Sequence, residues 1–159
     1  MITSVQVLLI LVGIVAIVVA TVLVIAAYSA HTVVRPRRSW RPGEIELPAK
    51  APESVTFKNG AGLRLHGWYV PPRARKAVVM VCHGFGTNRT EGIDVWPWLN
   101  EAGYGVLLFD FQAHGESEGR YTTVGLREVE DVHAAIDYLQ KREGEDVILL
   151  GFGISMGAS

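Results

Sequence analysis

The chain has 159 residues, of which 49% are hydrophobic and 19% are charged, and its net charge at pH 7 is −1. This balance is typical of a folded protein and argues against a nucleic-acid-binding protein, which needs a basic excess. The single cysteine, Cys82, excludes an internal disulfide and suits a reducing compartment.

The first predicted element is an apolar helix at the N-terminus. Residues 1–28 carry no charged side chain and are almost entirely Val, Ile, Leu and Ala from residue 5 onward. The run exceeds the roughly 20 residues that span a bilayer, and it lacks the polar face of a core helix. It predicts a single transmembrane helix within residues 1–30, with residues 5–28 in the membrane. A cleaved signal peptide is the alternative, because residues 27–29 form a weak cleavage site.

Residues 31–53 read as a juxtamembrane linker. They contain four prolines and mixed charges, without a helical or strand period. Four arginines lie in the first part of the linker: Arg35, Arg37, Arg38 and Arg41. Since no basic side chain precedes the apolar run, the positive-inside rule places the rest of the chain in the cytoplasm. The same arginines are expected to lie near anionic lipid headgroups.

Residues 54–159 show the pattern of an α/β domain. Two segments, 54–57 and 63–70, flank a glycine-bearing turn and predict an antiparallel β-hairpin. Continuous apolar runs predict three strands that are buried on both faces of a parallel sheet, at residues 77–82, 104–109 and 147–150. Helical segments between these runs indicate a mostly parallel sheet that is covered on both sides.

Two helices are predicted between the strands. The first covers residues 94–102, with Trp96, Leu99 and Trp98 as its apolar face. The second begins at the N-cap Thr123 and runs to about residue 141. Its apolar residues keep a spacing of three or four, as expected for one helix face: Leu126, Val129, Val132, Ile136 and Leu139.

The last predicted strand leads into the most informative motif, Gly153-Ile154-Ser155-Met156-Gly157. A G-x-S-x-G between a buried strand and a helix start is typical of a nucleophile elbow, whose sharp turn needs small neighbours. Ser155 is therefore the candidate catalytic nucleophile. The glycine spacing also resembles a dinucleotide-binding loop, but that interpretation requires an acidic residue about 20 positions later.

A second loop supports the nucleophile interpretation. His83-Gly84-Phe85-Gly86 directly follows the strand at residues 77–82. Acyl transfer needs N–H donors at the developing oxyanion, and one donor comes from this kind of loop while the other follows the serine. The backbone N–H groups of Phe85 and Met156 are the candidate donors. Gly84 and Gly86 allow the backbone of this loop to approach a substrate closely.

A third motif completes a family resemblance. Residues 110–117 read Asp-Phe-Gln-Ala-His-Gly-Glu-Ser and follow the strand at residues 104–109. Together the three motifs resemble the N-terminal half of an α/β-hydrolase, close to the membrane-anchored serine hydrolases called Bem46-like or serine-aminopeptidase-like. The third motif is similar to the family's D-x-R-G-x-G-x-S loop, with Gln112 in place of arginine and Ala113 in place of glycine.

The resemblance implies that Ser155 attacks the carbonyl of an ester, thioester or amide in a small-molecule or lipid-like substrate and forms an acyl-enzyme. Family members place the triad acid and histidine after the elbow, and this chain has two residues beyond the motif. The 159 residues are thus expected to be a truncated, inactive fragment whose last strand forms an apolar sheet edge. A membrane-tethered interaction module without catalytic activity is the alternative.

The remaining titratable residues are expected to have structural roles. His83, His114 and Asp110 lie in the loop motifs and are expected to hold those loops. The five histidines and Cys82 lack the paired spacing of a zinc site. No cofactor, metal ion or nucleic acid is predicted to bind.

Overall fold

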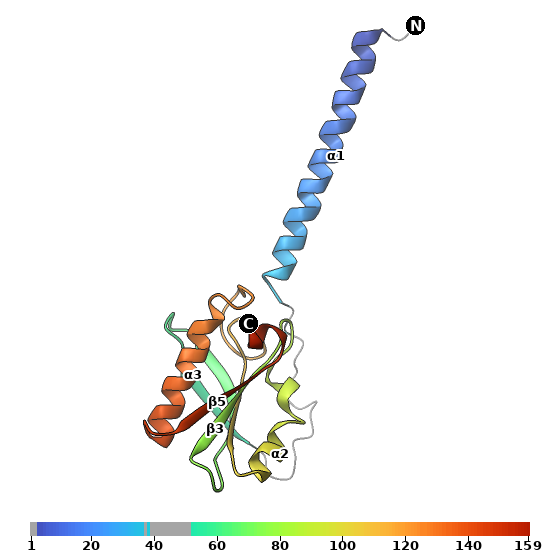
Figure 1. Cartoon of the computed structure of the whole chain (residues 1–159). Helices are drawn as coiled ribbons and strands as arrows, with labels where there is room; N and C mark the ends of the chain where they lie inside the picture. The colour runs from blue at the N-terminus through green and yellow to red at the C-terminus, as the bar shows by residue number, and fades with distance from the viewer. Residues whose placement is uncertain (1–2, 37, 39–51) are drawn as a thin grey trace. The chain divides into compact units, whose positions relative to one another are not determined.

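A computed structural model describes residues 3–36, 38 and 52–159 of the chain. The fold divides into two compact units, Met1–Val34 and Arg35–Ser159 (Figure 1). Most of the predicted linker, including Pro42, Pro48 and Arg41, lies outside the described residues, as does Arg37.

The N-terminal unit is one helix, α1, at Ser4–Val33. A capping box starts it, because the Thr3 side chain accepts from the Gln6 backbone and the Gln6 side chain accepts from the Thr3 backbone. Its 30 residues correspond to roughly 45 Å, which exceeds the hydrocarbon thickness of a bilayer. No residue of α1 is buried, and its length and apolar composition would allow it to cross a membrane. A signal sequence would meet the same two criteria.

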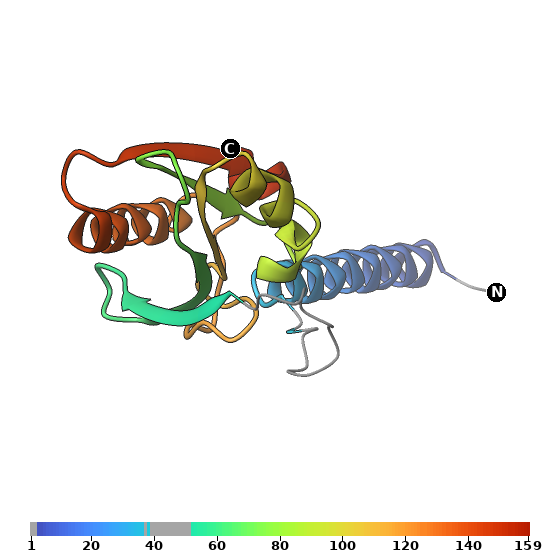
Figure 2. The ribbon, with the colours of Figure 1, turned by 90° about the horizontal axis from the view of Figure 1, so that it is seen from below.

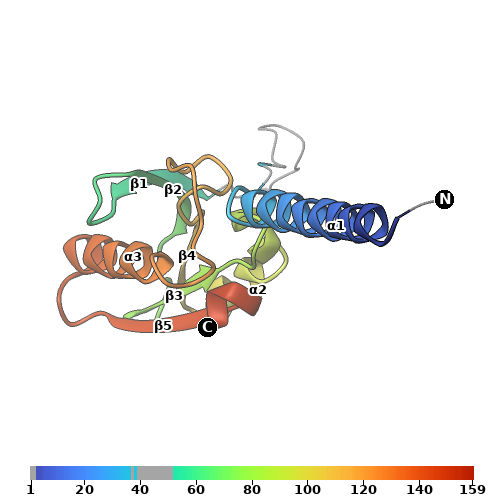
Figure 3. The same ribbon diagram turned by 90° about the horizontal axis from the view of Figure 1, so that it is seen from above.

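The second unit is built on a five-stranded mixed sheet in the order β1-β2-β4-β3-β5 (Figure 3). The strands are β1 Glu53–Lys58, β2 Arg64–Val70, β3 Ala77–Cys82, β4 Gly105–Phe109 and β5 Ile148–Gly153. β1 and β2 form the predicted antiparallel hairpin, and β2 also pairs antiparallel with β4. β3 pairs parallel with both β4 and β5. The predicted fold class, an α/β-hydrolase-like mixed sheet with an N-terminal hairpin, is confirmed.

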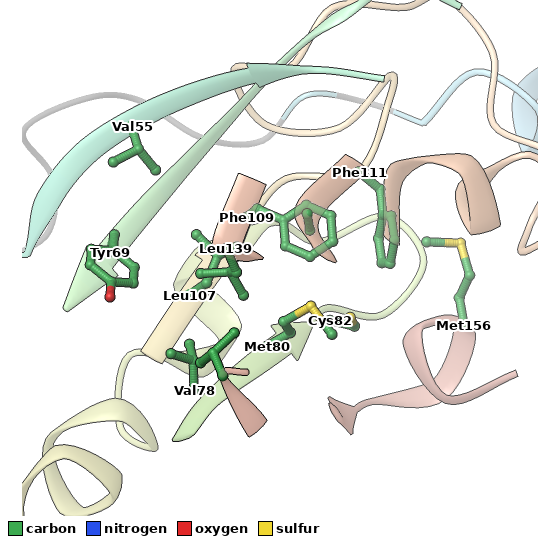
Figure 4. Close-up of a cluster of buried hydrophobic side chains, with 12 residues drawn as sticks. Val55, Tyr69, Val78, Met80, Cys82, Leu107, Phe109, Phe111, Leu139 and Met156 are labelled. Carbon is green, nitrogen blue, oxygen red and sulfur yellow. The ribbon is translucent and has the colours of Figure 1, made fainter. Parts of the chain in front are cut away.

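Helices cover the two faces of this sheet (Figure 2). On one face, α3 at Glu128–Glu143 packs through Ala135 and Leu139 against a cluster that includes Tyr69, Leu107 and Phe109 (Figure 4). On the other face, α2 at Trp96–Glu101 packs against a second cluster that includes Val79, Val81 and Leu108. Since β3 and β4 are buried along their whole length, their continuous apolar sequences are explained.

β5 differs from β3 and β4 because it lies at the edge of the sheet. Three of its large apolar side chains are exposed, namely Ile148, Leu150 and Phe152. The sequence predicts a strand buried on both faces at residues 147–150. Among the described residues, none covers the free edge of β5 or these three side chains. In this structure β5 is therefore an edge strand with an exposed apolar surface.

Both predicted helices are shorter at their N-terminal ends than the sequence indicates. α2 spans Trp96–Glu101 and carries Pro97 in its first turn, a position that proline favours. Trp96 and Leu99 are buried as predicted, whereas Trp98 is 53% exposed and does not belong to the apolar face. A 3₁₀ turn at Arg89–Gly92, η1, precedes α2.

The prediction of Thr123 as the N-cap of α3 is wrong. Val124 and Gly125 have positive φ values of 53° and 115°, so the chain cannot be helical there. α3 begins at Glu128, and Leu126 is 81% exposed outside the helix. The physical cause is Glu128, whose buried carboxylate accepts hydrogen bonds from Thr122, Thr123 and Gly125 and folds this segment into a loop.

Candidate active site

Ser155 lies at the sharp turn that follows β5. Its φ is 51°, a left-handed conformation that is rare outside glycine, and its side chain is exposed. A Cβ at Gly153 would overlap the carbonyl of Gly157, and a Cβ at Gly157 would overlap the carbonyl of Cys82. Both flanking glycines are therefore required by close backbone packing. A short 3₁₀ turn, η2 at Ser155–Ala158, replaces the predicted helix start.

The sheet brings the two predicted loops together. β3 and β5 are parallel neighbours, with Cys82 opposite Gly153, so the chain leaves both strands at the same end of the sheet. The Ile154 N–H donates to the Cys82 carbonyl over 3.0 Å. A Cβ placed on Gly84 would lie 3.5 Å from the Cβ of Ser155. The loop at residues 83–86 thus lies beside the serine.

Some backbone N–H groups at this site have an acceptor and others have none. The Gly84 N–H donates to the Glu91 carboxylate over 2.7 Å, and the Gly86 N–H donates to His114 Nε2 over 3.3 Å. Across the residues that the structure describes, no hydrogen bond engages the N–H of Phe85 or of Met156. These two N–H groups are the predicted oxyanion donors, and their assignment stays a prediction.

Glu91 and Thr87 hold the loop at residues 83–86, and the sequence patterns did not identify these two residues. The Thr87 hydroxyl donates to Glu91 Oε2 over 2.8 Å, beside the bond from Gly84. Glu91 belongs to η1, whose N-cap Asn88 accepts from the Thr90 N–H over 2.9 Å. The spacing Asn88-x-x-Glu91 has the form of a capping box and was the available signal.

The two buried histidines of the loops bind backbone groups through both ring nitrogens. His83 Nδ1–H donates to the Gly84 carbonyl over 2.7 Å, while the Phe111 N–H donates to His83 Nε2 over 3.1 Å. His114 Nδ1–H donates to the Gln112 carbonyl over 2.9 Å, and its Nε2 accepts from Gly86. Both rings therefore hold loop backbone, as the sequence analysis expects.

Burial keeps these two rings neutral. It lowers the pKa of His83 to about 4, an effect that the hydrogen bond to Gly84 opposes and the neighbouring His114 reinforces. Burial also lowers the pKa of His114, against the hydrogen bond to Gln112. The ring centroids of the two histidines lie 5.0 Å apart. Neutral rings suit the donor and acceptor pairing described above.

Asp110 organises the loop after β4. Its carboxylate accepts from the Arg89 N–H over 2.7 Å and from the Glu116 N–H over 2.9 Å, and it forms an ion pair with the buried Arg89 guanidinium. A Cβ on Gly115, whose φ is 46°, would overlap this carboxylate. The Ser117 hydroxyl donates to the Asp110 carbonyl over 2.6 Å. The residues that match the family's loop motif therefore each have a structural contact. They are Asp110, Gly115 and Ser117.

The two departures from the family motif also have visible consequences. Ala113, in the place of the usual glycine, is buried with a φ of 63°, so a side chain occupies a left-handed position. Gln112, in the place of arginine, donates its backbone N–H to Asp131 over 2.7 Å. Its side-chain Nε2 is buried without a hydrogen-bond partner among the described residues.

A hollow of about 460 Å³ lies under the elbow, between β5 and α3. Its lining includes Met80, Val132 and Phe152, and the Ser155 side chain does not take part. Cys82 also lines it, with a buried thiol whose pKa is raised to about 12 by burial. Within residues 3–36, 38 and 52–159, no three His, Cys, Asp or Glu side chains gather as metal ligands.

Known proteins share this arrangement. The chain is 37% identical over 112 residues to the protein YfhR of Salmonella typhimurium, covering 65% of this chain and 37% of that protein. It is 33% identical over 116 residues to Rv2307c of Mycobacterium tuberculosis, covering 71% of this chain and 40% of that protein. The chain therefore spans well under half the length of these curated relatives.

Solved structures agree with these relatives. The fold matches the esterase Pf2001 of Pyrococcus furiosus with a TM-score of 0.64 and 31% identity, covering 77% of this chain and 50% of that one. It matches the α/β hydrolase ATU1826 of Agrobacterium tumefaciens with a TM-score of 0.59 and 28% identity, covering 67% of this chain and 50% of that one. The sequence model described as serine aminopeptidase, S33, matches residues 73–159. The chain belongs to this serine aminopeptidase S33 family of α/β-hydrolases.

Proposed function

We propose that the whole protein is a serine hydrolase that cleaves an ester, thioester or amide through an acyl-enzyme on Ser155. The observation that carries the proposal is the exposed Ser155 at a left-handed turn, beside the loop at residues 83–86. A strained turn at a strand exit is the geometry that presents a nucleophile to substrate. The likeness to the esterase Pf2001 supports an acyl substrate, which we propose is a small molecule or lipid-like.

In the proposed reaction, Ser155 Oγ loses its proton to a base and attacks the substrate carbonyl carbon. The carbonyl oxygen becomes an oxyanion and accepts hydrogen bonds from the N–H groups of Phe85 and Met156. The alcohol, thiol or amine then leaves with a proton from the protonated base, and water hydrolyses the ester on Ser155 by the same steps. Such donors typically accelerate acyl transfer by about 10²–10³-fold each.

The proposed base is neither His83 nor His114, because both rings are buried and bind backbone groups through both nitrogens. His66 lies in β2 and His133 in α3. We assign the base and its acidic partner to sequence of the whole protein outside these 159 residues. By themselves the 159 residues then have little activity, since a serine without its base keeps only the contributions of the oxyanion hole and of binding.

Labelling with a fluorophosphonate probe tests both parts of the proposal. The whole protein with its natural continuation is expected to label, and Ser155→Ala is expected to abolish labelling. Ser159→Ala, which removes an exposed hydroxyl four residues away, is the matched control and is expected to label normally. Labelling that survives Ser155→Ala contradicts the nucleophile. Strong labelling of the 159 residues alone contradicts the placement of the base.

The proposal also places the protein in a membrane through α1. The second unit, Arg35–Ser159, which we call the hydrolase unit, then lies in the cytoplasm. Support comes from the predominantly apolar length of α1, which contains no Asp, Glu, Lys or Arg, and from the arginines that follow it. Retention in the membrane after alkaline extraction, together with an intact N-terminus, is the expected result. Release with cleavage near residue 29 would indicate a signal peptide instead.

A further inference from the structure

Three arginines from two distant parts of the chain line one hollow beside the loop after β4. The hollow has a volume of about 340 Å³. Its lining residues are Arg35, Pro36, Arg38, Ala113, Gly119 and Arg120. Arg35 and Arg38 precede the sheet in sequence, whereas Arg120 is contributed by the folded loop more than 80 positions later. The fold thus gathers three positive charges that the sequence separates.

Contacts within the unit hold two of these arginines at the hollow. The Arg35 guanidinium donates to the Tyr121 hydroxyl over 2.7 Å, and its carbon lies 4.7 Å from the centre of the Tyr121 ring. The Arg38 guanidinium donates to the Gly119 carbonyl over 2.8 Å. The acceptor of Arg38 is uncharged, and none of the six lining residues is acidic. Guanidinium groups grouped in this way match the charge and the planar oxygen pairs of a phosphate.

Arg35, which lines this hollow, closely follows the proposed membrane anchor in the sequence. Arg35 is the second residue after Val33, which ends α1, so the intervening chain spans at most about 7 Å. If α1 crosses a bilayer, Arg35 therefore lies at the level of the lipid headgroups. Negatively charged lipids concentrate basic side chains at that level.

We propose that this hollow binds the phosphate-bearing headgroup of an anionic membrane lipid. The inference rests on the proposed membrane anchoring and goes beyond it, because it assigns a headgroup site that includes Arg120 of the hydrolase unit. A bound lipid links the start of the linker to the loop after β4. A basic juxtamembrane segment without a site would attract anionic lipids through Arg35 and Arg38 alone.

Native mass spectrometry of the full chain tests the site. The protein is reconstituted in nanodiscs of phosphatidylcholine with a minor fraction of phosphatidylglycerol, released into neutral detergent, and the retained lipids are counted. We expect selective retention of one phosphatidylglycerol. Arg38→Gln and Arg120→Gln should each reduce this retention about fivefold, the contribution of one basic residue near an anionic surface. Arg127→Gln, an exposed arginine outside the hollow, removes the same charge and should change nothing.

The outcomes separate the site from its alternatives. Equal retention by wild type and Arg120→Gln overturns the site, and thermal melting of each variant verifies that the variant is folded. If inorganic phosphate displaces the lipid, and if lipid retention does not depend on phosphatidylglycerol, the hollow is a free-phosphate site. This result also overturns the proposal. Flotation with pure phosphatidylcholine vesicles measures the anchor independently, so loss of the anchor is distinguished from loss of the headgroup site.

Discussion

The loops that follow β4 and β5 leave the sheet on either side of β3 and are held in different ways. The loop at residues 110–120 is fixed by buried polar groups, with Asp110, Arg89 and Ser117 paired to one another or to backbone. The elbow at residues 153–157 is fixed by close packing of glycine backbones and places Ser155 in a strained, exposed position.

This difference is the one expected if the loop after β4 is structural and the elbow is reactive, as the proposed function requires. Buried polar groups are stabilising when they have partners, as the Asp110 carboxylate does. The elbow instead leaves the Ser155 side chain exposed, and in the described part of the chain the N–H of Met156 has no acceptor. A reactive site needs such groups to be available for a substrate. The predictions below test this contrast from the largest effect to the smallest.

Removing the Asp110 carboxylate should have the largest effect. Asp110→Ala is expected to destabilise the hydrolase unit by about 3–5 kcal/mol, because it breaks a buried ion pair with Arg89 and removes the acceptor of the Arg89 and Glu116 N–H groups. Denaturant unfolding of the full chain in neutral detergent, followed by tryptophan fluorescence, measures this change. Glu118→Ala, which removes the exposed pair with Arg64 in the same loop, is the control and should have a far smaller effect. Equal effects would contradict a structural role for Asp110.

His83 joins the loop after β3 to the loop after β4 and should make stability depend on pH. Its pKa is about 4 when folded and 6.5 when unfolded, so in this interval the unfolded chain binds the extra proton. Stability from this group is therefore present above pH 6.5 and is lost as the pH falls to 4, on the order of 3 kcal/mol in all. Burial raises the pKa of Asp131 to about 6, and this acts in the opposite direction between pH 3.8 and 6.

The contribution of His83 is isolated by comparing slopes. His83→Gln should flatten the rise in unfolding free energy between pH 4 and 6.5, whatever its effect at neutral pH. His133→Gln, which alters an exposed histidine of α3, should retain the wild-type slope. An unchanged slope in His83→Gln would show that this ring is not kept neutral by burial.

Gly153→Ala should damage the elbow through steric overlap. The new Cβ meets the backbone of Gly157 and Ala158, and we expect a destabilisation of about 1–3 kcal/mol together with loss of fluorophosphonate labelling in the whole protein. Gly151→Ala is the matched control on the same strand, because nothing lies within 4 Å of its Cβ position. If both variants label equally, close packing does not hold the elbow.

Ala113→Gly should have the smallest effect and should be stabilising. Relief of the left-handed backbone, worth about 1–2 kcal/mol, outweighs the roughly 0.5–1 kcal/mol that glycine loses in backbone entropy. A net gain of about 0.5–1 kcal/mol in unfolding free energy, with normal labelling, is expected from these values. Ser155→Gly relieves the same kind of strain, so it should also stabilise the unit but should abolish labelling. A loss of stability in Ala113→Gly would contradict this account.

Much of this fold could be predicted from local sequence patterns. The apolar runs gave the strands β3 and β4 because both are buried on two faces, and the turn glycines gave the β1–β2 hairpin. The three motifs were sufficient to identify the family, because each depends on short-range backbone requirements such as those of Gly115 and Gly157. The proposed roles of Ser155, Phe85 and Met156 stay predictions about chemistry.

Only the tertiary structure decided how distant side chains pair. Arg89 and Glu91 lie in an ordinary-looking polar segment, and their roles follow from contacts with Asp110 and Gly84. The start of α3 was misplaced because Glu128 bonds the preceding loop, a competition that helical periodicity does not reveal. Arg120 and Arg38 line one hollow only in the folded chain. Backbone requirements are local and are written in neighbouring residues, whereas charge pairing depends on distances that exist only after the chain has folded.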